Sequence, residues 1–300
     1  GVVTGSFDRS HWPTERRRRK AHREKVMKHD IPFSALVARP VKRDEIKRTP
    51  AAQVALQKEW AKLRKAGCWD EKNVREWDDV MSEARSKGKK AHNARLFEIC
   101  VEKGSELPAG DPNRKFKGRV VLQGNHVKDE YYDHAIFAEL SSCPSTMEAA
   151  KSCDAYGLLP GHVTEQCDAE QAYTQAKIQG TETWIEIPQH EWPESWKGMK
   201  RPVCLLILAL YGHPDAGGYW EKHCERHLLS VGFTQIAEWR SCYYHKKLKL
   251  FLTVYVDDFK MSGPRENVKA GWKLIRQGVK TEEPTPAGKY LGCDHIEGVM

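Results

Sequence analysis

The chain has 300 residues, 40% of them hydrophobic, so it can bury one large core or two ordinary ones. No apolar run reaches about 18 residues and the N-terminus is polar and then basic, which excludes a predicted membrane-spanning helix and signal peptide. Nine cysteines without a Cys-x-x-Cys pair argue against a disulfide framework or zinc knuckle. We expect an intracellular protein, in a cytoplasmic particle or the nucleus, and not a secreted or membrane-bound one.

The net charge of +8 lies entirely in the N-terminal segment. Residues 1–50 contain 14 Lys/Arg and 6 Asp/Glu, and the rest of the chain is neutral. The block Arg16-Arg17-Arg18-Arg19-Lys20 has too few apolar neighbours to fold alone, so residues 1–48 are predicted to be a disordered basic arm. The arm could bind phosphates or act as a nuclear import signal, or it could be a solvated linker.

The folded region is predicted to span residues 49–300 and to open with a helix. Thr49 and Pro50 are favourable first residues, Gly67 is a natural stop, and a stripe of apolar residues lies between them at Leu56, Trp60 and Leu63. Residues 71–92 are highly charged, and their pattern indicates no role.

A hairpin with one basic side is predicted next. Residues 96–101 alternate through Phe97, Ile99 and Val101 as a half-buried strand, and residues 104–113 form a turn. In the second strand, 115–123, Lys117 and Arg119 are two residues apart and project from one face. This face could bind a triphosphate or a nucleic-acid backbone, or it could simply be solvated.

The middle of the chain alternates between predicted helices and strands. Ser145 and Glu148 form a capping box for a helix that ends near Gly157. Strands are predicted over 163–168, 184–187 and 203–208, followed by an amphipathic helix from Pro214 to about Ser230. The first of these strands ends at Asp168.

An apolar run over 248–254 leads into two adjacent carboxylates, Asp257 and Asp258. Adjacent side chains on a strand point to opposite faces, so the two can converge only at a turn, such as a hairpin tip. Paired carboxylates repel each other unless a cation or proton lies between them, and Mg²⁺ prefers oxygen ligands of this kind. With Asp168 they make a set of three, able to hold two divalent ions about 4 Å apart for phosphoryl transfer. A plain polar turn is the alternative.

The last segment completes an α+β pattern. A helix is predicted over about 266–278, with Val268, Trp272 and Ile275 on its packed side, and a final strand over 289–296. The order from residue 163 onward is typical of an antiparallel sheet with helices on its back. The chain ends at Met300 in the middle of a strand-like segment, as expected for a fragment of a longer polyprotein.

Several motifs, in this order, resemble the reverse transcriptase of copia-type long-terminal-repeat retrotransposons. The resemblance covers roughly residues 51–296, and its most specific parts are the Asp168 block and the Tyr-Val-Asp-Asp block. It is carried by Lys117-Gly118-Arg119-Val120-Val121-Leu122-Gln123-Gly124, Gln166-Cys167-Asp168 to Ala172-Tyr173, Ile185-Glu186-Ile187-Pro188-Gln189, Ala209-Leu210-Tyr211-Gly212 through Trp220, Leu229-Ser230-Val231-Gly232-Phe233-Thr234, Tyr255-Val256-Asp257-Asp258 and Tyr290-Leu291-Gly292.

The resemblance implies a polymerase-like palm with a fingers hairpin, and a thumb that is absent or incomplete. By resemblance, Tyr173 lies under the incoming sugar and excludes a 2′-hydroxyl, and Lys117 and Arg119 face the triphosphate. The resemblance also implies that Asp168, Asp257 and Asp258 bind two Mg²⁺ ions, or Mn²⁺, and carry catalysis.

The implied activity is RNA-directed DNA polymerisation, a nucleotidyl transfer to a primer 3′-hydroxyl encoded by a transposable element. The expected partners are an RNA template, a DNA primer, deoxynucleoside triphosphates and other parts of a Pol polyprotein. One departure is notable, because Asp215 and Gly218 stand where the family has Gln and Arg. Two alternatives therefore remain: a catalytically decayed nucleic-acid-binding protein, and a basic-tailed scaffold without enzymatic activity.

Overall fold

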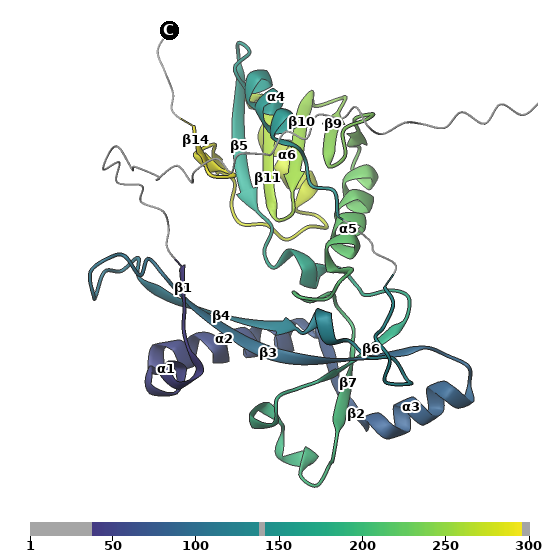
Figure 1. Ribbon diagram of the computed structural model, residues 1–300. Coiled ribbons are helices and arrows are strands. Elements are labelled where there is room, and N and C mark those ends of the chain that lie inside the picture. The colour runs from purple at the N-terminus through teal and green to yellow at the C-terminus, as the bar shows by residue number, and fades with distance from the viewer. Residues whose placement is uncertain (1–37, 138–141, 296–300) are drawn as a thin grey trace, which may run out of the picture.

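The computed structural model describes residues 38–137 and 142–295 (Figure 1). The basic block at residues 16–20 lies outside the described residues. Ordered structure begins earlier than the predicted boundary at residue 48, with strand β1 (Ala38–Pro40) and helix α1 (Arg43–Arg48). β1 pairs with β3, and Arg39 forms ion pairs with Glu45 at 2.6 Å and Glu102 at 2.7 Å. Residues 38–48 therefore pack against β3 and belong to the folded region.

A first sheet of six strands forms the lower part of the molecule in Figure 1. Its strand order is β1-β3-β6-β7-β2, and β4 pairs with β3. The β3–β6 pair is parallel and the other pairs are antiparallel. The remaining strands are β2 (Trp69–Glu76), β3 (Ala91–Lys103), β4 (Lys115–Leu122), β6 (Glu182–Glu186) and β7 (Pro202–Leu206).

Helix α2 (Pro50–Ala66) confirms the predicted first helix. Gly67 ends it with a φ of 69°, which glycine adopts at low cost, and the three residues of the predicted apolar stripe are buried. The charged segment without a predicted role forms part of β2 and helix α3 (Trp77–Ser86). Trp77 and Val80 of α3 are buried, so this segment contributes to the core.

The β3–β4 hairpin is present, but the predicted buried side of β3 is wrong. Ile99 is exposed and Phe97 is half-buried, whereas Leu96 and Cys100 are buried on the other face. Both alternate sets of residues are partly apolar, so alternation alone could not choose between them. Helix α2 decides the outcome, because Trp60 and Leu63 share a core with Leu96.

A second sheet of six strands forms the upper part, with order β12-β5-β11-β10-β9-β8. All its neighbouring pairs are antiparallel. The strands are β5 (His162–Asp168), β8 (Thr234–Gln235), β9 (Cys242–His245), β10 (Leu250–Tyr255), β11 (Asp258–Pro264) and β12 (Thr285–Pro286).

Helices cover both faces of the second sheet, not only its back as predicted. α5 (Ala216–Ser230) and α6 (Arg265–Ile275) share one core with Leu250 and Leu252 of β10. α4 (Met147–Gly157) packs against Phe251, which points to the opposite face. The N-cap of α4 is Thr146, whose hydroxyl accepts a hydrogen bond from the Ala149 N–H at 3.2 Å, one residue later than the predicted cap.

The predicted final strand is a small hairpin instead. β13 (Lys289–Tyr290) and β14 (Cys293–Asp294) pair with each other, and the chain turns at Leu291 (φ 48°) and Gly292 (φ 80°). A glycine in this region of φ favours a turn over a continuous strand.

The α+β prediction is confirmed as a mixed fold of helices and largely antiparallel sheets. The chain crosses between the two sheets more than once, because β5 lies in the second sheet whereas β6 and β7 return to the first. Within residues 38–137 and 142–295, every helix is too short or too polar to span a lipid bilayer. Short 3₁₀ helices are η1 (Gly124–His126), η2 (Ala172–Gln175), η3 (Gln189–Glu191) and η4 (Glu194–Trp196).

Candidate functional site

The predicted hairpin with two carboxylates joins β10 to β11. Tyr255 pairs with Asp258, leaving Val256 and Asp257 as a two-residue loop. Val256 has a φ of 57°. Such tight loops need a positive φ to match the twist of the strands, which explains how two consecutive Asp residues come to the tip of the sheet.

The structure brings Asp168 to this tip. Asp168 ends β5 and stands directly opposite Asp258 in the β5–β11 ladder, so their side chains leave the same face of the sheet. The Ala169 N–H donates to the Asp257 carbonyl oxygen at 2.7 Å. Asp168 is therefore a neighbour in space of Asp257 and Asp258, although the pair lies far from it in the chain.

The neighbouring carboxylates change the acidity of Asp258. Burial raises its pKa to about 6, and the charges of Asp168 and Asp257 and a hydrogen bond with Asp168 act in the same direction. Like charges held this close favour either a bound proton or a bound cation. The set of oxygen ligands therefore fits a hard divalent ion such as Mg²⁺.

Because the pKa of Asp258 is raised in the folded chain, the free energy of unfolding should depend on pH when EDTA keeps metal ions away from the site. At pH 4 its carboxyl is protonated in the folded chain and partly protonated in the unfolded chain, where its pKa has the ordinary value of 3.8, so the penalty on the folded chain is small. Above pH 6 the carboxyl is ionised in both states, and the full penalty applies to the folded chain. The Asp258→Asn variant should therefore be more stable than wild type at pH 8, by about 1 kcal/mol after allowance for solvent screening. The gain should nearly vanish at pH 4. Urea unfolding at the two pH values measures it, and an equal gain at both would contradict the prediction.

The predicted substrate-binding residues line the region between the hairpin and β4. Lys117 and Arg119 of β4 are half-buried; the pKa of Lys117 is lowered first by burial and then by Arg119, and Asp257 opposes this. The Arg119 guanidinium lies 5.4 Å from the ring centroid of Tyr211 and 3.7 Å from Glu59. Asp257 is thus close enough to act on Lys117 across the two sheets.

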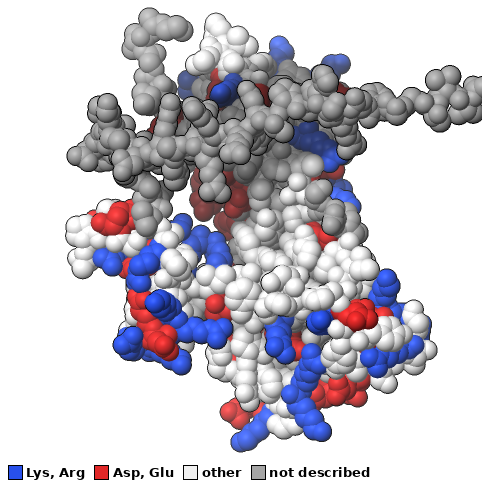
Figure 2. Space-filling view, in the orientation of Figure 1, with Lys and Arg blue, Asp and Glu red and all other residues white. Residues whose placement is uncertain are grey.

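Tyr173 connects these cations to the carboxylates. Its ring centroid lies 4.7 Å from that of Tyr211, and burial raises the pKa of both phenols, with Asp257 adding to the effect. Tyr211 had no role predicted from the sequence. In Figure 2, acidic side chains gather in a recess between the upper and lower parts of the molecule, with basic side chains on the facing surface. The site therefore has an acidic wall at the hairpin and a basic wall on β4, and Tyr173 and Tyr211 link the two.

Asp215, one of the two departures from the family pattern, is buried. It is 4% exposed just before α5, and its N–H donates to Nδ1 of His213 at 3.1 Å. Burial lowers the pKa of His213 to about 4, an effect that Asp215 opposes and His92 increases. Phe137 packs edge-on between the two imidazoles. Asp215 belongs to this buried cluster, so it is not a carboxylate displayed to a triphosphate.

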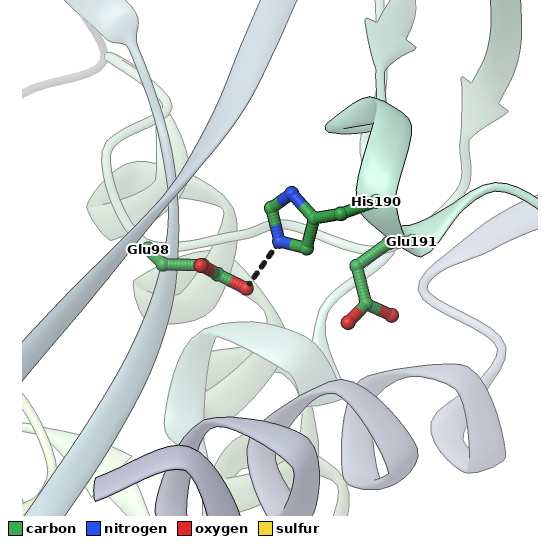
Figure 3. Close-up of side chains that lie close together, drawn as sticks. All are labelled: Glu98, His190 and Glu191. Atoms are coloured by element: carbon green, nitrogen blue, oxygen red, sulfur yellow. Dashed lines mark hydrogen bonds and ion pairs between the residues drawn. The ribbon is translucent and has the colours of Figure 1, made fainter. Parts of the chain in front are cut away.

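A second cluster of possible metal ligands lies in the first sheet and was not predicted. Glu98, His190 and Glu191 have ligand atoms all within 4.8 Å of one another, which no other such group reaches in the part of the chain that the structure describes (Figure 3). The carboxylate oxygens of Asp168, Asp257 and Asp258 are therefore not all within 4.8 Å of one another. Glu98 already accepts hydrogen bonds from His190 and the Trp60 indole, and Glu191 pairs with Arg64 at 2.7 Å. These bonds explain the cluster without a metal ion, because they link β3, α2 and η3 to one another.

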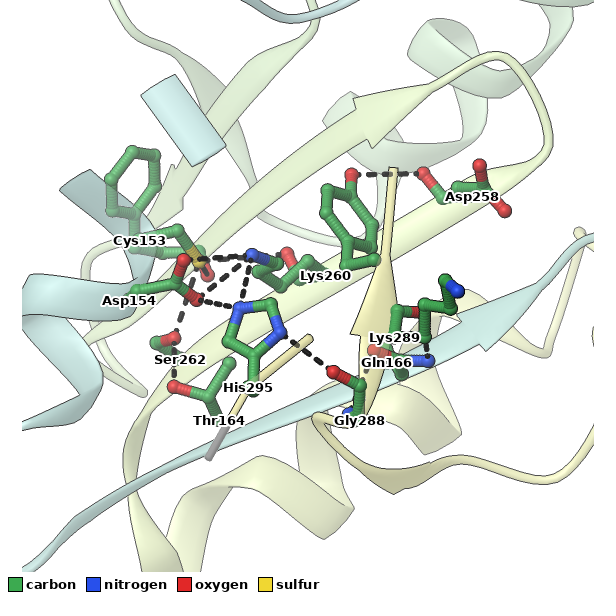
Figure 4. Close-up of polar contacts among 12 residues, drawn as sticks. Cys153, Asp154, Thr164, Gln166, Asp258, Lys260, Ser262, Gly288, Lys289 and His295 are labelled. Carbon is green, nitrogen blue, oxygen red and sulfur yellow. Dashed lines mark hydrogen bonds and ion pairs between the residues drawn. The ribbon is translucent and has the colours of Figure 1, made fainter. Parts of the chain in front are cut away.

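A buried lysine, also missed from the sequence, lies on the strand that carries Asp258. Lys260 is 1% exposed and donates to Asp154 of α4 at 2.8 and 2.9 Å (Figure 4). Its ammonium lies 3.1 Å from Nε2 of His295 and 4.1 Å from the ring centroid of Tyr290. The Tyr290 hydroxyl reaches the backbone carbonyl of Asp258 at 3.4 Å. Lys260 therefore docks the C-terminal hairpin beside the carboxylates.

The chain matches the model of a known protein family. A family model described as reverse transcriptase (RNA-dependent DNA polymerase) matches residues 108–298, well over half of the chain. The matched segment contains Asp168, Asp257 and Asp258 together with Lys117, Arg119 and Tyr173. No curated protein matches the chain.

Proposed function

The chain belongs to the reverse transcriptase (RNA-dependent DNA polymerase) family, and from this premise we propose that it adds deoxynucleotides to a primer 3′-hydroxyl at the carboxylate site. The observation that carries the proposal is the register of β5 and β11, which sets Asp168 opposite Asp258 beside the loop that holds Asp257. In this proposal the second sheet is the palm and the β3–β4 hairpin belongs to the fingers.

The carboxylates would hold two Mg²⁺ ions, or Mn²⁺. When bound, the ions supply activation of the primer hydroxyl and neutralisation of the leaving pyrophosphate. The chain supplies position: the β5–β11 ladder fixes Asp168 against Asp258, and the backbone bond from Ala169 fixes Asp257. Catalysis of this kind consists largely of positioning and charge stabilisation.

The remaining residues would bind the nucleotide. Lys117 and Arg119 place two cations opposite the carboxylates, where a triphosphate would lie between the two walls. Tyr173 would lie under the sugar and exclude a 2′-hydroxyl, and its ring is held in place by packing against Tyr211. The order and identity of the motifs support a copia-type retrotransposon origin, with further Pol polyprotein segments as partners.

Primer extension tests the proposed function. The purified chain is incubated with an RNA template, a labelled DNA primer and deoxynucleotides, and we expect extension with Mg²⁺ and none with EDTA. Binding of the template and primer without extension in Mg²⁺ or Mn²⁺ would favour the decayed alternative instead. No divalent-ion binding at Asp168 would favour the scaffold. The burial of Asp215 weakens one of the two observations that favoured decay, and the other, Gly218, still stands.

The half-buried ammonium of Lys117 leads to a prediction about nucleotide affinity. Lys117→Met should raise the KM for deoxynucleotides about tenfold with little change in kcat, because it removes a charge that binds substrate and transition state alike. Lys115→Met, on the same strand face but exposed, is the matched control and should keep the wild-type KM. Single-nucleotide incorporation over a range of nucleotide concentrations measures both. A wild-type KM in Lys117→Met would remove this residue from the substrate site.

A further inference from the structure

The loop that carries Asp257 has an unfavourable backbone. Val256 adopts a φ of 57° although it is β-branched, at the position where two-residue hairpin loops favour glycine. Such a conformation persists only where the surroundings hold it in place. The question is therefore which groups hold this loop.

Two hydrogen bonds from outside the hairpin hold consecutive carbonyls of the loop. The indole Nε1–H of Trp220, on α5, donates to the Val256 carbonyl oxygen at 2.7 Å. The Ala169 N–H donates to the Asp257 carbonyl oxygen at 2.7 Å. The second bond is part of the backbone next to Asp168, whereas the first depends on one side chain.

The indole itself has little freedom to move. Trp220 is 2% exposed, shares the core of the second sheet with Val254 and Phe259, and is stacked on His223 with ring centroids 5.9 Å apart. Val256 is half-buried, and without the indole donor its carbonyl would have to remain unpaired or find another partner. Either change would loosen the loop that sets the position of Asp257 relative to Asp168.

We propose that Trp220 is a positioning residue of the polymerase site, which fixes the Val256–Asp257 loop through its indole N–H and thereby sets the carboxylates for metal binding. This inference rests on the function proposed above. It assigns to Trp220 a role beyond packing, because the ring alone would fill the same space without holding the carbonyl.

The test compares two tryptophan-to-phenylalanine variants. Trp220→Phe keeps an aromatic ring and removes the N–H. Trp192→Phe is the matched control, since its indole also donates to a backbone carbonyl, that of Ile187, at 2.7 Å but in the first sheet. We expect Trp220→Phe to lower kcat about tenfold, to raise the Mg²⁺ concentration for half-maximal rate, and to leave the KM for the primer unchanged. Trp192→Phe should match wild type in all three.

A folded Trp220→Phe variant with wild-type kcat and Mg²⁺ requirement would overturn the proposal. A second measurement does not depend on that variant or on activity. The chain has ten tryptophans, and in an assigned ¹H–¹⁵N spectrum of the wild type the Trp220 indole signal should shift on addition of Mg²⁺ while that of Trp192 does not. An unmoved Trp220 signal would also overturn the proposal. Absent primer extension by the wild type would count against the proposed function alone.

Discussion

Asp257→Asn is expected to lower Mg²⁺-dependent primer extension by about 10³-fold or more. The substitution keeps the size of the side chain and removes the negative charge at the tip of the β10–β11 loop. Loss of one anionic ligand weakens the charge stabilisation on which this chemistry depends, and each tenfold in rate corresponds to about 1.4 kcal/mol of barrier. Single-turnover extension with a saturating primer and template measures the loss.

The control for this variant is Asp79→Asn, which removes an exposed carboxylate of helix α3, outside the carboxylate site. It should extend the primer at the wild-type rate. Because Asp257 lies in a loop whose backbone bonds are unchanged by the substitution, thermal unfolding of the two variants should be similar. Extension by Asp257→Asn within about tenfold of wild type would refute the metal-binding role of this residue.

Gly212→Ala is expected to be the most destabilising single substitution considered for this chain, at about 3 kcal/mol or more. Gly212 has a φ of 89°, and an added Cβ would lie 2.0 Å from the backbone oxygen of Leu122. Because the obstacle is backbone, side-chain rotation cannot relieve the overlap. The same loop accepts a hydrogen bond at the Tyr211 carbonyl from the Leu122 N–H at 2.8 Å. The substitution would therefore separate β4 from the segment that leads into α5.

Gly198→Ala separates the steric effect from the backbone effect. Gly198 has a similar φ of 96° but no atom within 4 Å of an added Cβ. Its replacement should cost only about 1 kcal/mol, the price of a left-handed conformation in a residue with a side chain. Urea unfolding measures the two variants side by side, and equal losses would show that the close approach at Gly212 is not important.

The sequence was sufficient for the parts of the site that depend on short-range pattern. An apolar run ending in adjacent Asp residues predicts a hairpin tip, and Asp168 ends a strand of its own, so their proximity could be inferred. The side of β3 that faces the core could not, because Phe97 and Leu96 are both apolar and only the position of α2 distinguishes them.

Residues whose partners are distant in the chain were missed for a different reason. Lys260 interrupts an apolar strand, and nothing near it in sequence reveals that Asp154 and Tyr290 surround its ammonium. The indole of Trp220 looks like an ordinary core residue of an amphipathic helix until its N–H is seen to meet the Val256 carbonyl, 36 residues away. Polar contacts made by buried side chains are specified by tertiary packing, which periodicity does not encode.

The return of the chain to the first sheet has a consequence for biosynthesis. β6 and β7 complete that sheet only after β5 has been made, so a ribosome must synthesise the chain beyond residue 186 before β3 gains its parallel neighbour β6. Until then one edge of β3 lacks that neighbour, and long-range parallel pairing is slow to form. Nascent chains of this length should therefore be the species most dependent on chaperones during translation.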